Sequence, residues 1–180
     1  AELVQNRGFE YDPADKKYRD KSWNSYKAWE FTGNNEAFDI DTLNPVHPNQ
    51  QHYAVLTISG DDQALVNKGF DGIPVKAGEK YDFSVFARSP DDRKGRLLIR
   101  LVDQNDEVIA QNKSKKVSDE WEKLSLVLKA EETADQARLQ VVPQFTGKIA
   151  LDMISLFPQN TFKGRKNGLR ADLAQTIANM

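Results

Sequence analysis

The chain has 180 residues with a formal net charge of −2, and 39% of its residues are apolar while 29% are charged. This size and composition suit one soluble globular domain, or one domain with a remnant of a second, because a disordered chain would carry too few apolar residues to form a core. The small net charge provides no positive electrostatic field that would attract nucleic acid. No apolar run approaches the roughly 20 residues of a membrane span. The lack of cysteine excludes disulfides and a thiol nucleophile.

The first fifty residues show little regular periodicity. Between residues 11 and 51 aromatic residues are scattered among many polar ones, and Pro45 and Pro48 interrupt the segment. We expect a long aromatic-rich loop here, with one short strand around residues 29–32. Loops of this length in a compact domain are usually functional or flexible.

Regular alternation begins at Tyr53 and continues almost to the end of the chain. In the run 81–88 the core face is expected to hold Tyr81, Phe83, Val85 and Ala87. Polar turns separate the expected strands, at 53–59, 70–75, 81–88, 96–102, 108–110, 122–129, 136–142 and 148–157. Seven or eight short strands of this kind predict an all-β fold, a two-sheet β-sandwich.

Three conspicuous motifs are interpreted as structural. The basic run Lys113–Lys116 is expected to be a solvated turn between strands, and Asp103–Glu107 a hairpin-type turn without the spacing of a calcium-binding EF-hand. His47 and His52 lie five residues apart in a loop with proline, and a zinc site would need a third ligand. None of these motifs predicts a catalytic or zinc centre.

The last residues have a different period. Leu169, Leu173, Ile177 and Met180 follow a helical spacing of i, i+4, i+8 and i+11, so a C-terminal amphipathic helix is expected. An isolated helix of about a dozen residues is marginal in water, so its apolar face needs a surface to cover.

Both ends and the middle of the chain resemble known families. The run SLFPQNTFKGRKNGLRADLAQ (155–175) and the opening AELVQNRGFEY resemble the N-terminal part of α-L-arabinofuranosidases of glycoside hydrolase family 51, where such segments lie near the start of a (β/α) barrel. Between them, four features are similar to carbohydrate-binding modules of families 4 and 9: the N-x-G-F-E motif at residues 6–10, AGEKYDFSVFARS at 77–89, Trp121 and IALDMISL at 149–156.

The resemblance implies a division of the chain into two parts. Residues 1–157 would form a jelly-roll, galactose-binding-like sandwich, and residues 158–180, with the helix, would be the remnant of a truncated catalytic barrel. Since the catalytic glutamates of the family lie further along than Met180, this chain would not be an enzyme by itself, although its parent would be a retaining arabinofuranosidase. An inserted domain leaves its host where it enters, so Ala1–Gln5 should lie close to Phe157–Thr161.

The function implied by the resemblance is non-catalytic carbohydrate binding. The module would target its parent enzyme to arabinose-containing plant cell-wall polysaccharide, arabinan or arabinoxylan, with the barrel of the same chain as its second partner. The alternative is a structural accessory domain that packs on the barrel and binds no sugar. The resemblance also implies that the parent lies outside the cytoplasm of a bacterium, as a secreted, periplasmic or cell-surface protein.

Candidate sugar-binding residues are aromatic rings and planar polar side chains, which contact the C–H faces and hydroxyls of a sugar. They form an early-loop platform and an outer sheet face: Trp23, Tyr26 and Trp29 in the loop, and Tyr53, Phe86, Arg88, Arg100 and Gln140 on the sheet. Each has a structural alternative, since Phe86 could sit under a loop, the arginines could pair with acids and the tryptophans could belong to the core.

The resemblance also implies a structural calcium ion between the first and last strands. Its side-chain ligands would be Glu10 and Asp152, because carboxylate oxygens suit this hard cation. The alternative, that both are ordinary strand-end acids, is equally open. No other cofactor is expected.

Overall fold

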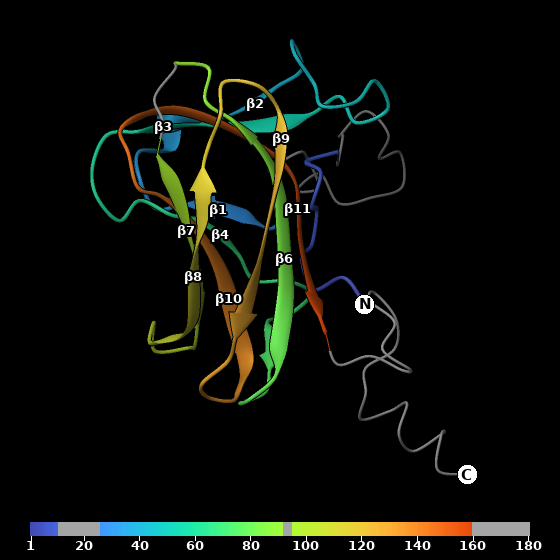
Figure 1. The fold of residues 1–180 in the computed structure, drawn as a ribbon, viewed down its shortest axis with the longest axis vertical. Helices are drawn as coiled ribbons and strands as arrows, with labels where there is room; N and C mark the ends of the chain where they lie inside the picture. The colour runs from blue at the N-terminus through green and yellow to red at the C-terminus, as the bar shows by residue number, and fades with distance from the viewer. Residues whose placement is uncertain (11–25, 92–94, 160–180) are drawn as a thin grey trace.

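Two facing β-sheets make up the computed structural model, which describes residues 1–10, 26–91 and 95–159 (Figure 1). The elements in chain order are β1 (Trp29–Phe31), the 3₁₀ helix η2 (Asn35–Ala37), β2 (Phe38–Asp41), β3 (Tyr53–Ile58), β4 (Leu65–Asn67), β5 (Ile73–Val75), β6 (Lys80–Arg88), β7 (Arg96–Val102), β8 (Val108–Lys116), β9 (Glu122–Lys129), β10 (Ala134–Pro143) and β11 (Gly147–Pro158). The expectation of an all-β, two-sheet sandwich is confirmed.

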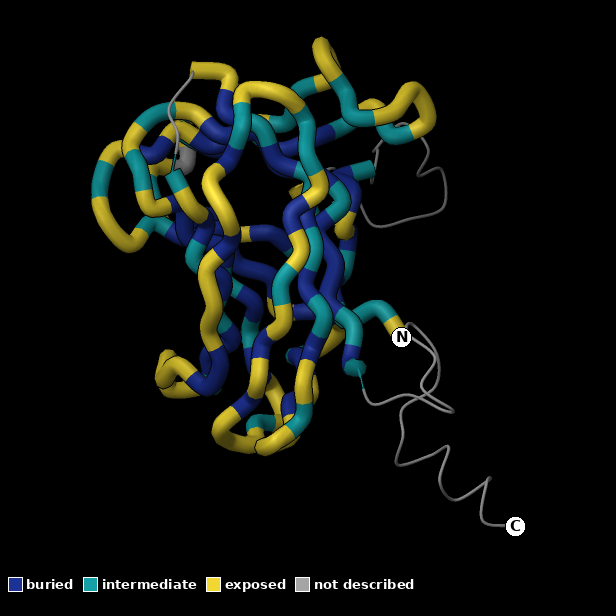
Figure 2. The backbone as a smooth tube through the Cα atoms, viewed as in Figure 1, coloured by how far each residue is buried: buried dark blue, intermediate teal, exposed yellow. Residues whose placement is uncertain are grey.

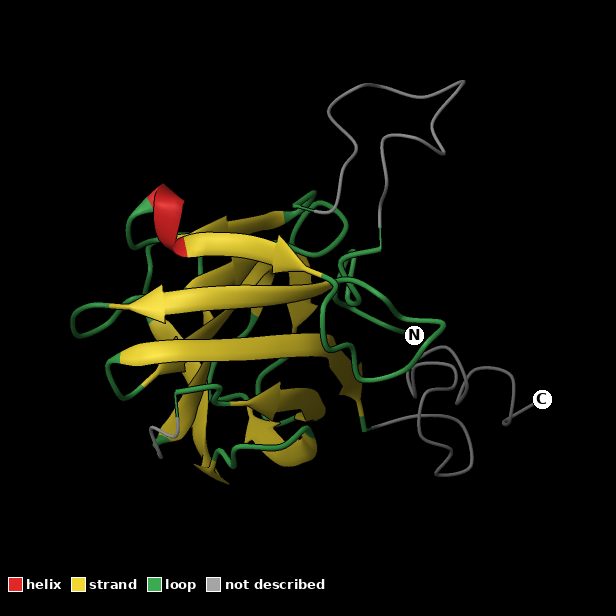
Figure 3. Cartoon of the chain, turned by 90° about the horizontal axis from the view of Figure 1, so that it is seen from above, coloured by secondary structure: helices red, strands yellow, loops and turns green. Residues whose placement is uncertain are grey.

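All strand pairs are antiparallel. One sheet, called here the β10 sheet, has the order β1-β4-β10-β7-β8, with β5 also paired to β10. The other, the β11 sheet, has the order β2-β3-β11-β6-β9. Figure 3 shows the strands side by side from above, with the 3₁₀ helix leading directly into β2.

The core lies between the two sheets and is built by alternation along the strands. In β6 the predicted core face is confirmed, because Tyr81, Phe83, Val85 and Ala87 are all buried. The β10 sheet contributes Leu97, Ile99, Leu101, Leu139 and Val141 from the facing side. Figure 2 shows buried positions inside and exposed positions outside along these strands, as expected for sheets with one wet face.

The prediction of a turn at Lys113–Lys116 was wrong, because these residues belong to β8. The strand lies at the edge of the β10 sheet, and its apolar alternation is lost where most side chains face water. Ser114 is the exception: it is buried, and its hydroxyl oxygen accepts the backbone N–H of Leu97 at 3.0 Å. Lysines on an edge strand also discourage pairing with another chain.

The described residues contain eleven strands instead of seven or eight. The short strands β2 and β4 lie in segments that show no clear alternation, and the run 70–75 forms a strand only at Ile73–Val75. β8 is longer than expected, as described above. Each sheet therefore contains a short strand, β2 or β4, that the sequence does not indicate.

The N-terminal segment lies against the end of β11 (Figure 1). The backbone N–H of Leu3 donates to the carbonyl oxygen of Leu156 at 3.0 Å. The Glu2 carboxylate accepts the Ser155 hydroxyl at 2.6 Å and the Leu156 N–H at 2.8 Å. The first residues of the chain thus contact Ser155 and Leu156, directly before the segment Phe157–Thr161 that was predicted to lie beside them; residues 160 and 161 lie outside the described residues.

The expected C-terminal helix, with Leu169, Leu173, Ile177 and Met180, also lies outside the described residues. β11 itself continues to Pro158, and the N–H of Gln159 still donates to the Lys80 carbonyl oxygen. Over the part of the chain that the structure describes, no helix has the length and apolar character needed to cross a membrane.

Candidate functional site

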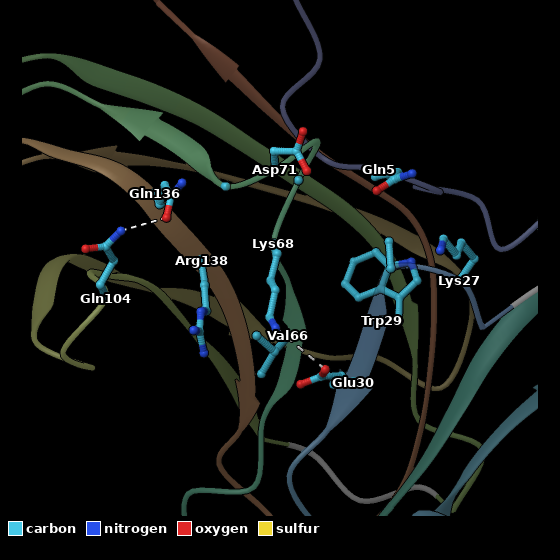
Figure 4. Close-up of a pocket in the computed structure, with 13 residues that line it drawn as sticks. Gln5, Lys27, Trp29, Glu30, Val66, Lys68, Asp71, Gln104, Gln136 and Arg138 are labelled. Atoms are coloured by element: carbon cyan, nitrogen blue, oxygen red, sulfur yellow. Dashed lines mark hydrogen bonds and ion pairs between the residues drawn. The ribbon is translucent and has the colours of Figure 1, made fainter. Parts of the chain in front are cut away.

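A groove of about 760 Å³ lies on the outer face of the β10 sheet, at its β1 edge (Figure 4). The strands β1, β4 and β10 form its floor, and two loops close its end. Its lining is mostly polar: Gln5, Lys27, Ala28, Trp29, Glu30, Val66, Lys68, Gly69, Asp71, Gly72, Gln104, Gln136 and Arg138. A hollow of this size is within the usual range of ligand sites, about 300–1,000 Å³.

Strand register explains why these side chains share one face. Val66 pairs with Glu30 on one side and with Gln140 on the other, so all three point away from the core. Along β10, Arg138 and Gln136 lie two and four residues before Gln140, and side chains two residues apart share a face of a strand. The floor of the groove is therefore the outer face of the β10 sheet, the face directed away from the core.

The loop 68–72 closes one end of the groove. The N–H of Gly72 donates to the Lys68 carbonyl oxygen at 2.7 Å, and Gly69, Asp71 and Gly72 all have positive φ. A Cβ atom on Gly72 would lie 2.8 Å from the Cα of Gln136, so this turn requires glycine both for its backbone angle and for its close approach to β10.

The polar groups of the groove differ in how far they are already engaged. The Gln104 amide donates to the Gln136 side-chain oxygen at 2.7 Å, which leaves the nitrogen of the Gln136 amide for a further hydrogen bond. Lys68 lies 3.9 Å from the Glu30 carboxylate. Arg138 is half-buried and makes no hydrogen bond or ion pair with any described residue.

Trp29 lines the groove but is a core residue more than a platform. Only 6% of it is exposed. Its indole N–H donates to the Asn6 carbonyl oxygen at 2.7 Å, and its ring lies 5.0 Å from that of Phe9, centroid to centroid. The structural alternative, a tryptophan in the core, therefore describes Trp29 better than the expected platform.

The other two loop aromatics do not complete a platform in the described residues. Tyr26 is 41% exposed and packs edge-on against Phe38 at 5.0 Å. It lines a separate hollow of about 420 Å³ with Trp29, Glu30, Phe31 and Phe38. Trp23 lies outside the described residues.

Arg100 and Gln140 lie on the same outer face as the groove but do not line it. The Arg100 Nε donates to the Gln140 side-chain oxygen at 3.0 Å, and its Nη1 lies 2.9 Å from the Asp62 carboxylate. An arginine paired with an acid was the structural alternative for this residue. We conclude that Arg100 is already engaged within the fold.

Tyr53, Phe86 and Arg88 lie on the opposite side of the molecule, on the outer face of the β11 sheet. Tyr53 is 3% exposed, because the Trp121 ring covers it edge-on at 5.3 Å. Its burial raises the pKa of the phenol, an effect opposed by the hydrogen bond from the Asn44 N–H. The predicted sugar-binding set is thus divided between two faces.

Glu10 and Asp152 lie close enough for their charges to interact, where the N-terminal segment meets β11. The Glu10 oxygens contact the backbone N–H and the Nδ1 of His52, each at 2.7 Å. Asp152 is fully buried, and its Oδ1 accepts the Met153 N–H at 2.8 Å.

The second oxygen of Asp152, Oδ2, has no hydrogen-bond partner in the part of the chain that the structure describes. Burial raises the pKa of this carboxyl to about 8; the Met153 N–H opposes that shift and the charge of Glu10 adds to it. Among the described residues no group of three or more His, Cys, Asp or Glu side chains is placed to hold a metal. Backbone carbonyls would have to supply further ligands for a calcium ion.

Several groove residues were not predicted, namely Glu30, Lys68, Gln104, Gln136 and Arg138. One signal could have found two of them: Gln136, Arg138 and Gln140 recur at every second position of an expected strand. Glu30 comes from the short strand expected at 29–32, which is too short to show a period, and Lys68 and Gln104 come from turns.

Comparison with known proteins supports a binding role. The carbohydrate binding domain family matches residues 1–148. The chain is 34% identical to an extracellular exo-α-L-arabinofuranosidase of Streptomyces chartreusis over 179 residues, 99% of this chain but 20% of the relative. It is similar to a solved arabinose-bound GH51 α-L-arabinofuranosidase with a TM-score of 0.79 and 29% identity, over 99% of this chain and 29% of that one.

A more distant likeness concerns the fold alone. A solved CBM4 structure has a TM-score of 0.54 at 14% identity and is covered over 99% of its length by 87% of this chain. This chain spans about a fifth of the curated Streptomyces relative, and it matches a family of binding domains, not catalytic ones. The chain belongs to the carbohydrate binding domain family of modules 4 and 9 and corresponds to a non-catalytic part of GH51 arabinofuranosidases.

Proposed function

We propose that the groove of the β10 sheet binds arabinose-containing plant cell-wall polysaccharide, arabinan or arabinoxylan. The module would hold a catalytic barrel of the same chain, an α-L-arabinofuranosidase, beside its substrate outside a bacterial cell. Two matched proteins are named arabinofuranosidases, one of them extracellular and the other arabinose-bound. Attachment to the polymer raises the effective concentration of substrate around the barrel without any new catalytic contact.

The observation that carries this proposal is the groove itself. Its floor offers the amides of Gln104 and Gln136 beside charged groups, and planar polar side chains of this kind orient sugar hydroxyls. On the β11 sheet, in contrast, Tyr53 is already covered by Trp121.

Affinity electrophoresis on arabinan and on arabinoxylan tests the proposal. Gln136→Ala should weaken binding by about tenfold, because one lost hydrogen bond in a binding site costs about 1.4 kcal/mol. Phe86→Ala, on the opposite sheet, is the matched control and should bind like the wild type. If folded protein is retarded by neither polymer, or if only Phe86→Ala loses binding, the groove is not the arabinan or arabinoxylan site.

A second candidate function is a structural accessory domain that packs on the barrel. The buried state of Trp29 favours it, because a sugar platform would expose that ring. Phe86, however, is only half-buried, and Trp23 lies outside the described residues. In this case the module would bind no glycan, yet its deletion from the full-length parent would lower the melting temperature of the barrel.

We further propose a structural calcium ion held by Glu10 and Asp152. The unpartnered Oδ2 of a fully buried carboxylate fits such a cation, because a buried anion otherwise needs a donor or a counter-charge. The ion would supply that charge and tie the N-terminal segment to β11. Calcium should raise the melting temperature over that in chelator, and Asp152→Asn should remove the difference; an unchanged wild-type melting temperature would contradict the proposal.

A further inference from the structure

Two arginines on the outer face of the β10 sheet differ in one respect. The guanidinium of Arg100 is held by the Gln140 oxygen at 3.0 Å and by the Asp62 carboxylate at 2.9 Å. Arg138, on the neighbouring strand, lines the groove and has no hydrogen bond or ion pair with the described residues (Figure 4). A half-buried cation without a partner loses hydration and gains nothing in return, so this position favours an acceptor from outside.

The charges of the described groove residues nearly balance. Three cations, Lys27, Lys68 and Arg138, stand against two acids, Glu30 and Asp71, which gives a net charge of +1 among the described lining residues, and Lys27 is engaged in an interaction of its own. Glu30 already lies 3.9 Å from Lys68, and Asp71 belongs to the exposed loop at the end of the groove. Neither acid pairs with Arg138.

We propose that the groove prefers acidic glycans and that Arg138 binds the carboxylate of a uronic acid residue. This inference rests on the proposed function of the groove. A guanidinium offers two parallel N–H donors that match a carboxylate, a geometry that lysine lacks. The Gln136 amide, two residues away on the same face, is placed to bind a hydroxyl of the same sugar or of its neighbour.

Isothermal titration calorimetry with matched ligands tests this inference. The ligands are a xylo-oligosaccharide bearing one glucuronate and an oligogalacturonate, each beside its carboxyl-reduced, neutral counterpart. The wild type should bind at least one acidic form about tenfold more tightly than its neutral counterpart, since hydrogen bonds to charged groups are worth about 1.5 kcal/mol or more. Raising the salt concentration should reduce this preference.

Two variants separate the site from general charge. Arg138→Gln should bring the ratio of the acidic to the neutral affinity close to one, whereas Lys113→Gln removes one positive charge from the exposed strand β8 and should keep the ratio of the wild type. Equal wild-type affinity for acidic and neutral forms, or a preference that survives in Arg138→Gln, would overturn the inference while the groove still binds glycan. Absence of binding to every ligand, arabinan and arabinoxylan included, would overturn the proposed function itself.

Discussion

At the scale of single residues, Asp152 should control how stability depends on pH. Its pKa is about 8 in the fold against an ordinary 3.8, so between these values the folded state binds more protons than the unfolded state. The free energy of unfolding in chelator should therefore fall as the pH rises from about 4 to about 8. Urea unfolding at several pH values measures it, and Asp152→Asn should flatten the slope.

Asp61→Asn is the matched control, because Asp61 is exposed and its substitution should leave the slope unchanged. A wild-type slope of zero in chelator would show that Asp152 is ionised in the fold. Calcium, if bound, should favour the ionised carboxylate and reduce the slope in the wild type but not in Asp152→Asn.

Trp29 shows why the candidate site was only partly predictable. An aromatic residue in a polar segment fits a platform and a core equally well when the segment has no period. The structure buries Trp29 against Phe9 and bonds it to Asn6. Trp29→Ala should therefore cost about 3–5 kcal/mol of stability, so it cannot serve as a clean test of sugar binding.

At the scale of elements, the loop 68–72 should tolerate no side chain at Gly72. Gly72→Ala combines a positive φ of 95° with a contact of 2.8 Å to Gln136, and Gly78→Ala has a similar φ of 85° with no atom within 4 Å. In the Gly78 variant the free energy of unfolding should fall by about 1–2 kcal/mol because of the backbone angle alone. The free energy of unfolding, measured in urea, should fall further for Gly72→Ala, which should also weaken glycan binding. Equal decreases in the two variants would mean that the loop accommodates the methyl group without displacing β10.

Strands with a regular buried face were well predicted, and the polar second half of β8 was not. The run 96–102 agrees with β7 in both bounds, and 122–129 agrees with β9, because each is a short run rich in apolar residues between polar turns. Beyond Ala110, β8 pairs with β7 on one side and with no described strand on the other, and its side chains are polar. Backbone pairing alone forms that half of the strand, and pairing leaves no pattern in the sequence.

The division of the site between two faces has a similar cause. Alternation along β6 and β10 correctly places Phe86 and Gln140 outside the core. It does not tell which sheet each strand joins, since β10 pairs with β4 and β7, far from it in the sequence, while β6 pairs with β9 and β11. Residues that share the property of facing outward therefore need not share a surface.

At the scale of the whole molecule, Glu2 should stabilise the fold by linking the N-terminal segment to the last strand. Its carboxylate accepts hydrogen bonds from Ser155 and Leu156, joining the first residues to the last strand. Glu2→Ala leaves both donors without this partner and should cost about 1–3 kcal/mol in urea unfolding. Glu132→Ala, in the exposed turn before β10, should cost almost nothing; a Glu2 variant as stable as this control would mean that the end of β11 holds without the N-terminal segment.

The hydrogen bond between Leu3 and Leu156 holds the beginning of the sandwich beside its last strand. Because entry and exit are neighbours, the module could be grafted into a surface turn of an unrelated enzyme without forcing that turn apart. The same proximity permits circular permutation, in which a short linker joins the two ends and the chain is reopened in the exposed turn Asp103–Glu107. A permuted module should keep both sheets and would be attached to a partner enzyme through the turn between β7 and β8.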